Sequence, residues 1–73
     1  MTRAALGNRL KEWRAKAGLT QAELAERTGV TRKTINTIEN RVFIPSALLA
    51  LRIAAALDAQ VEDVFYLDPE TKG

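Results

Sequence analysis

The side chains best suited to recognition chemistry lie between residues 31 and 40, a stretch whose spacing predicts a helix. At about 100° per residue, Ile35 and Ile38 fall on one side and hydrogen-bond donors fall on the other. The polar side comprises Arg32, Lys33, Asn36 and Thr37. Donors of these types suit base edges and phosphates in a DNA major groove. The alternative interpretation is an ordinary solvated helix face.

The residues before this helix decide between the two interpretations. Thr20 is a helix N-cap, and Glu23, three residues on, completes a capping box. Gly29 ends that helix where a positive φ is expected, and Thr31 caps the next one. Ala25 is small enough for the two helices to approach closely. Apolar residues stand at the remaining buried positions, which are Leu24, Val30, Ile35 and Ile38. The spacing is that of a helix-turn-helix and favours the recognition interpretation.

The composition bounds what else the chain does. The 73 residues include no cysteine and no histidine, which excludes disulfides, thiolate metal sites and the commonest general base. The only serine, Ser46, is expected to cap a helix, so no catalytic set is present and we predict no enzyme, no metal and no cofactor. No apolar run is long enough to span a membrane and no signal peptide is visible, which predicts a cytoplasmic protein.

Charge is spread unevenly along the chain. Residues 1–41 hold nine Lys and Arg against four Asp and Glu, whereas residues 42–73 hold two against five. A basic half that contains the helix-turn-helix suggests one face for a polyanion. The length predicts a single domain over residues 1–67, with the helix-turn-helix at residues 20–40 and a polar C-terminal tail at residues 68–73.

Three further helices are expected to support this motif. Apolar residues spaced by three or four predict a first helix over residues 4–17, a fourth over 47–57 and a short fifth over 61–67. Trp13 lies on the apolar face of the first helix and is interpreted as core. Strand signals are nearly absent, and we assign no sheet. The expected fold class is therefore all-α, a compact five-helix bundle.

One ion pair is expected within this bundle. Arg14 lies beside the apolar face of the first helix, and Glu39 lies at the edge of the buried side of the helix that follows Thr31. A charge so placed usually needs a partner, so we predict that the two residues pair and tie these helices together. The alternative is that each side chain reaches water independently.

Four segments in order resemble the phage-repressor/Cro-like (Xre-type) helix-turn-helix transcriptional regulators. They are Asn8-Arg-Leu-Lys-Glu-Trp-Arg, Gly18-Leu-Thr-Gln-Ala-Glu-Leu-Ala, Gly29-Val-Thr-Arg-Lys-Thr-Ile-Asn-Thr-Ile-Glu-Asn and Ile44-Pro-Ser. The resemblance covers about residues 6–66. It implies a lambda-repressor-like five-helix bundle and sequence-specific binding of double-stranded DNA, usually as a dimer.

The resemblance also implies roles for individual residues. Base or adjacent backbone contacts fall on Arg32, Lys33, Asn36 and Thr37, and phosphate contacts fall on Gln21, Thr31, Asn40 and Arg41. The Arg14–Glu39 pair matches a pair of the family. The family commonly has glycine where this chain has Arg41, which adds a phosphate-seeking charge to the loop.

A single module of this size reads few base pairs, so a palindromic operator bound by a homodimer is expected. Apolar residues that the core does not use predict the dimer interface, namely Leu48, Leu51, Tyr66, Leu67 and Pro69. The alternative is that Leu48 and Leu51 are scattered surface residues or fill the local core. No domain for a small-molecule effector is expected.

The biological role stays open at this point. A repressor or autoregulator, a restriction–modification controller and the antitoxin of a toxin pair all fit the sequence. The alternative from another class is a protein-interaction adaptor that keeps the fold without binding DNA. An acidic or apolar face on the helix over residues 31–40 would favour the adaptor, and this face is neither.

Overall fold

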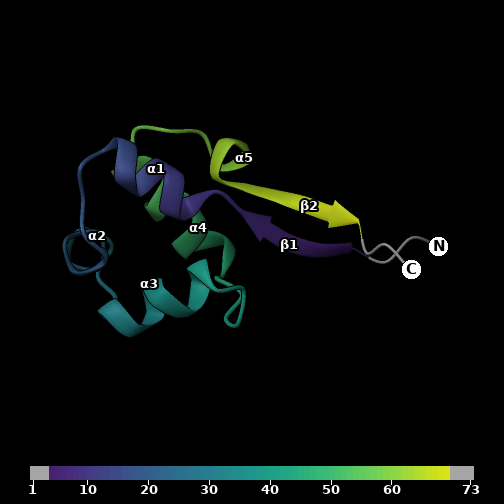
Figure 1. Ribbon diagram of the computed structural model, residues 1–73, viewed down its shortest axis with the longest axis horizontal. Coiled ribbons are helices and arrows are strands. Elements are labelled where there is room, and N and C mark those ends of the chain that lie inside the picture. Colours follow the sequence, from purple (N-terminus) through teal and green to yellow (C-terminus); the bar gives the residue numbers. More distant parts are fainter. Residues whose placement is uncertain (1–3, 70–73) are drawn as a thin grey trace.

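Five helices and a two-stranded antiparallel sheet make up the fold in the computed structural model, which describes residues 4–69 (Figure 1). In chain order the elements are β1 (Ala4–Asn8), α1 (Leu10–Lys16), α2 (Gln21–Thr28), α3 (Arg32–Glu39), α4 (Ala47–Ala56), α5 (Val61–Val64) and β2 (Phe65–Pro69). Among these helices, none is long and apolar enough to cross a membrane.

Hydroxyl caps set the start of the three central helices, as the sequence predicts. The side-chain oxygens of Thr20, Thr31 and Ser46 each accept a hydrogen bond from the backbone N–H three residues ahead. Each cap satisfies one of the amides that a helix leaves unpaired at its first turn. Just after α4, Asp58 adopts the left-handed conformation with φ 55°.

The core lies where α1 to α5 meet. Its fully buried side chains are Leu10, Leu24, Ile35, Ile38, Ile53 and Val64. Trp13 packs against this core, and its indole N–H donates to the Asp63 carbonyl at 3.0 Å. Thr28 is the one buried polar residue among those described, and its hydroxyl donates to the Leu24 carbonyl at 2.8 Å. A polar residue therefore sits in the helix-turn-helix core without an unsatisfied group.

The expectation of an all-α fold is wrong, because both ends of the domain are strands. β1 pairs with β2 in antiparallel register, with Leu6 opposite Leu67 and Asn8 opposite Phe65. The two strands lie side by side and reach away from the helices (Figure 1). The helix expected over 4–17 spans only Leu10–Lys16, and the one expected over 61–67 spans only Val61–Val64.

Local side chains explain why the first helix begins late. The Asn8 carboxamide oxygen accepts from the Leu10 N–H at 3.1 Å, and its amide donates to the Ile38 carbonyl at 3.0 Å. Leu6 still packs against the core, but from a strand. Gly7 is buried, and a Cβ there would clash with the Tyr66 ring unless the ring moved.

The structure also changes where the predicted polar tail over residues 68–73 begins. Asp68 and Pro69, expected to begin it, are part of β2. The remaining residues of that segment, 70–73, lie outside the described residues.

Candidate nucleic-acid interface

The turn between α2 and α3 holds the two helices in a fixed relation. Gly29 has φ 74°, in the left-handed region, and the Val30 N–H donates to the Ala25 carbonyl at 3.0 Å. Ala25 itself is 3% exposed, so α3 approaches α2 closely at this point. The Thr31 hydroxyl then accepts from the Thr34 N–H at 3.2 Å and begins α3. This is the arrangement that the helix-turn-helix spacing predicts.

The outer face of α3 is polar and largely open. Arg32, Lys33 and Asn36 are exposed and together line one shallow hollow. Thr37 is half-buried, and its hydroxyl donates to the Lys33 and Thr34 carbonyls, each at 3.0 Å. The hydroxyl proton of Thr37 is thus engaged within α3. Of the four residues expected to reach bases, Arg32, Lys33 and Asn36 are the ones with free donors on the surface.

The predicted pair between Arg14 and Glu39 forms and binds α1 to α3. The Arg14 Nε lies 2.7 Å from Glu39 Oε2, with side chains 16% and 6% exposed. Arg14 also donates to the Leu19 carbonyl at 2.8 Å, and the Gln21 amide donates to Glu39 Oε1 at 3.0 Å. The Glu39 carboxylate is therefore shared by α1, α2 and α3. Such a fully hydrogen-bonded charge fixes geometry more than it adds net stability.

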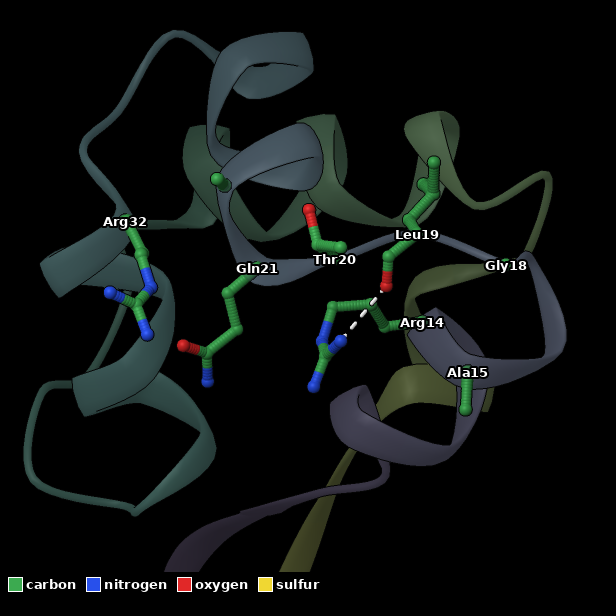
Figure 2. Close-up of a pocket in the computed structure, with 8 residues that line it drawn as sticks. Arg14, Ala15, Gly18, Leu19, Thr20, Gln21 and Arg32 are labelled. Carbon is green, nitrogen blue, oxygen red and sulfur yellow. Dashed lines mark hydrogen bonds between the residues drawn. The ribbon is translucent and has the colours of Figure 1, made fainter.

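A hollow beside this network lies between α1, the start of α2 and Arg32. Its lining includes Arg14, Leu19, Thr20, Gln21 and Arg32. Figure 2 shows the Gln21 amide between the guanidinium groups of Arg32 and Arg14. Gln21 was expected to contact phosphate; one of its two amide hydrogens is used on Glu39 and the other remains. The Gln21–Glu39 contact was not expected, because Gln21 was assigned to a phosphate.

The loop after α3 is held by internal hydrogen bonds rather than left open. The Asn40 side-chain amide donates to the Asn36 carbonyl at 2.9 Å. Arg41 has φ 62°, in the left-handed region that glycine favours, and its guanidinium donates to Asp68 of β2 at 3.1 Å. Both residues were expected to meet phosphates. In this structure Arg41 links the loop to the sheet through a pair that is 44% exposed on each side.

Replacement of Arg41 by glycine is expected to remove a positive charge without lowering the free energy of unfolding. A non-glycine residue with positive φ is strained by about 1 kcal/mol, whereas an exposed ion pair contributes about 0.5 kcal/mol. Arg41→Gly should therefore leave the free energy of unfolding unchanged or raise it by about 0.5 kcal/mol, measured by urea denaturation. Arg41→Ala keeps the strain and loses the pair, so it is the matched control and should be less stable than wild type.

The capping box of α2 predicts a pH dependence. The backbone N–H of Thr20 donates to the Glu23 carboxylate, which holds the pKa of Glu23 below its ordinary value of 4.5. A lowered carboxyl pKa contributes stability above the unfolded-state pKa and loses it as pH falls through the folded-state pKa. Wild type should therefore melt higher than Glu23→Ala near neutral pH, and the gap should shrink as the pH falls below the ordinary pKa of 4.5. A gap that stays constant across the titration would contradict this.

The residues predicted for the dimer interface are mostly at the surface. Leu48, Leu51 and Leu67 are 59%, 56% and 75% exposed, and Pro69 is exposed. Tyr66 differs, because its ring covers Gly7 and lies 4.4 Å from the Arg9 guanidinium.

Sequence reasoning missed a second apolar surface in the connector between α3 and α4. Val42, Phe43 and Ile44 are all exposed, with Val42 at 76% and Ile44 at 70%. The signal was present in the sequence, since three consecutive apolar residues precede Pro45. Within residues 4–69, no three acidic side chains cluster closely enough to hold a metal ion.

Comparison with known proteins identifies the family to which this chain belongs. A family profile described as helix-turn-helix matches residues 10–64, from the start of α1 to the end of α5. The chain belongs to this family, and its relatives carry the name of helix-turn-helix transcriptional regulators.

Particular relatives cover most of the chain. The Bacillus subtilis regulator YgzD, described as uncharacterized, is 48% identical over 63 residues, which is 86% of this chain and 96% of YgzD. The restriction-modification controller C.AhdI from Aeromonas hydrophila superposes with TM-score 0.72 at 33% identity, covering 75% of this chain and 80% of C.AhdI. The biofilm master regulator SinR, solved in complex with DNA, superposes with TM-score 0.69 at 33% identity, covering 74% and 87%.

Proposed function

We propose that this protein is a transcriptional regulator that binds double-stranded DNA by direct readout, with α3 in the major groove. The observation that carries the proposal is the face of α3 on which Arg32, Lys33 and Asn36 are exposed together. Arg32 is the candidate for a bidentate contact to guanine, and Asn36 suits adenine. Lys33 acts on a base or on the adjacent phosphate.

The rigid support behind this face favours readout over a solvated surface. The Glu39 carboxylate joins α3 to α1 and α2, so the helix that carries the exposed donors is already positioned before DNA binds. The hollow between Arg14, Gln21 and Arg32 is a candidate phosphate-binding site at the start of α2, because the N-terminus of a helix favours an anion. The complex of SinR with DNA supports this use of a similar fold.

The proposed operator is palindromic and is bound by a homodimer. One domain of 73 residues reads only a few base pairs, and two copies related by a two-fold axis double the site. Exposed leucines lie on two alternative surfaces for such an interface, Leu48 and Leu51 on α4 and Leu67 on the sheet. Repression or autoregulation is the role that occupancy of an operator by a small domain most directly produces.

The experiment is titration of the protein against a randomised duplex library at two salt concentrations. Enrichment of one palindromic sequence, with affinity falling steeply as salt rises, is the expected outcome. Salt-sensitive binding without an enriched sequence would leave a nonspecific DNA-binding protein. Failure to bind any duplex at low salt would overturn the proposal.

A protein-interaction role is the second candidate. The exposed connector Val42–Ile44 favours it, because three neighbouring apolar side chains on a small domain commonly mark a binding surface. SinR is also known in a complex with the protein SinI. An adaptor that keeps the fold without binding DNA would bind no duplex in the titration, so the same experiment separates the two candidates.

A further inference from the structure

The two-stranded sheet has an outer edge on β1 that nothing in the described chain pairs with. β1 contacts β2 along its whole length, and the two strands extend away from the helices (Figure 1). A two-stranded ribbon is marginal in water without further strands or packing. Its edges are templates for pairing with another chain unless they are protected.

The hydrogen-bond register shows which groups the edge presents. The Arg9 N–H donates to the Val64 carbonyl at 2.7 Å, directly next to the Asn8–Phe65 pair. Hydrogen-bonded and non-hydrogen-bonded pairs alternate in an antiparallel ladder. Gly7 and Ala5 therefore bond to β2, and the N–H and C=O of Ala4 and Leu6 point to the outer edge.

The opposite edge, on β2, is protected. By the same alternation Pro69 faces outward, and proline has no N–H to donate. Asp68 places a charge on the same strand, in its pair with Arg41. β1 has neither device, since residues 4–8 are Ala-Ala-Leu-Gly-Asn, without charge or proline. The free edge of β1 is thus the one open to a neighbour.

We infer that a second copy of this chain pairs through β1, antiparallel and centred on Ala5, to make one four-stranded sheet. The inference rests on the proposed homodimer and names its interface. Pairing about a two-fold axis sets Ala4 against Leu6 of the partner copy and Ala5 against its own counterpart. An uncharged strand meets its copy without like-charge repulsion, and the small Ala5 suits the close approach at the axis.

The same arrangement places the apolar side chains of both copies on one face of the sheet. Leu6 and Leu67 are directly opposite each other and share one face of the ribbon. Leu67 is 75% exposed in the single chain. In the four-stranded sheet the Leu6–Leu67 pairs of both copies lie on the same face, and Leu6 of each copy is diagonal to its counterpart across the axis. The Asn8 side chain is hydrogen-bonded to α3, so that end of β1 lies next to the helices. A dimer axis at Ala5, three residues away, leaves room for the helices of both copies.

The test uses single cysteines, which is clean because the sequence contains none. In the inferred dimer Ala5 and its counterpart form a non-hydrogen-bonded pair with Cα atoms about 4.5 Å apart, within reach of a disulfide. Ala5→Cys should oxidise almost fully to a covalent dimer. Leu51→Cys, exposed on α4, is the matched variant and should stay monomeric on a non-reducing gel. Cross-linking of Leu51→Cys and not of Ala5→Cys would overturn the inference and move the interface to α4.

A second pair of variants tests dimerisation through the β1 edge without relying on a disulfide. Ala5→Lys adds a charge at the axis and should weaken dimerisation at least about tenfold by sedimentation equilibrium. Ala55→Lys, at an exposed position on α4, should leave dimerisation unchanged. Equal dimerisation of both variants would overturn the inference, as would a wild-type chain that stays monomeric with and without duplex DNA. The library titration reads DNA binding separately, so failure of the interface and failure of the proposed function are distinguishable.

Discussion

Replacement of Glu39 by alanine is expected to lower the free energy of unfolding by about 3 kcal/mol. Glu39 is 6% exposed in its side chain and accepts hydrogen bonds from both Arg14 and Gln21. Its removal leaves the Arg14 guanidinium with 16% exposure and no carboxylate partner, which is the penalty for an uncompensated, mostly buried charge. Urea denaturation followed by the fluorescence of Trp13, the only tryptophan, measures the effect.

The matched control is Glu26→Ala, an exposed glutamate on α2, which should change the free energy of unfolding by less than about 0.5 kcal/mol. The double replacement Arg14→Met with Glu39→Leu removes both charges together. It should recover most of the loss, because hydrophobic residues of similar volume replace a buried pair at little net expense. Equal stability of wild type and Glu39→Ala would show that the pair is irrelevant to the fold.

Arg32→Ala is expected to weaken binding to the enriched operator by about 10- to 100-fold and to relax its preference at one base pair. The basis is the loss of a bidentate contact to guanine, which contributes about 1–3 kcal/mol of discrimination. Arg32 is exposed and begins α3, so its removal leaves the core intact. Anisotropy titrations on the operator and on single-base variants of it measure affinity and preference together.

Two further variants distinguish readout from simple charge. Arg52→Ala removes an exposed arginine from α4 and should change affinity less than about twofold. Lys33→Ala should weaken binding to all duplexes similarly and reduce the slope of affinity against salt by about one if Lys33 contacts a phosphate. Equal losses for Arg32→Ala and Arg52→Ala would mean that only net charge matters, and direct readout by α3 would be rejected.

The helical part of the fold was predictable because its signals are local. Hydroxyl caps, a glycine in the turn and apolar spacing lie within a few residues of the helices they define, so α2, α3 and α4 begin where the sequence predicts. The outward face of α3 follows from helical periodicity alone. Arg14 and Glu39 were predicted as a pair because each is a charge placed beside a buried face.

The sheet was not predictable in the same way. β1 and β2 are about 60 residues apart in the chain, and neither has the alternation of a lone strand. Leu6 and Leu10 are spaced as on a helix, and that spacing suggested one. The structure shows instead that Asn8 ends β1 and accepts a hydrogen bond from the Leu10 N–H, and that Leu6 reaches the core from a strand.

By itself, the sequence determined the helix-turn-helix, its family and the identity of the donors on α3, because each depends on residues close together in the chain. Apart from the Arg14–Glu39 pair, only the tertiary structure decided the partners of the polar groups around them. Gln21 meets Glu39, and Arg41 meets Asp68 rather than standing free. These contacts join elements whose relative position is set by packing of the whole core, which no local pattern encodes. The unpaired edge of β1 also follows from the tertiary structure, because the pairing with β2 decides which edge of β1 remains without a neighbouring strand.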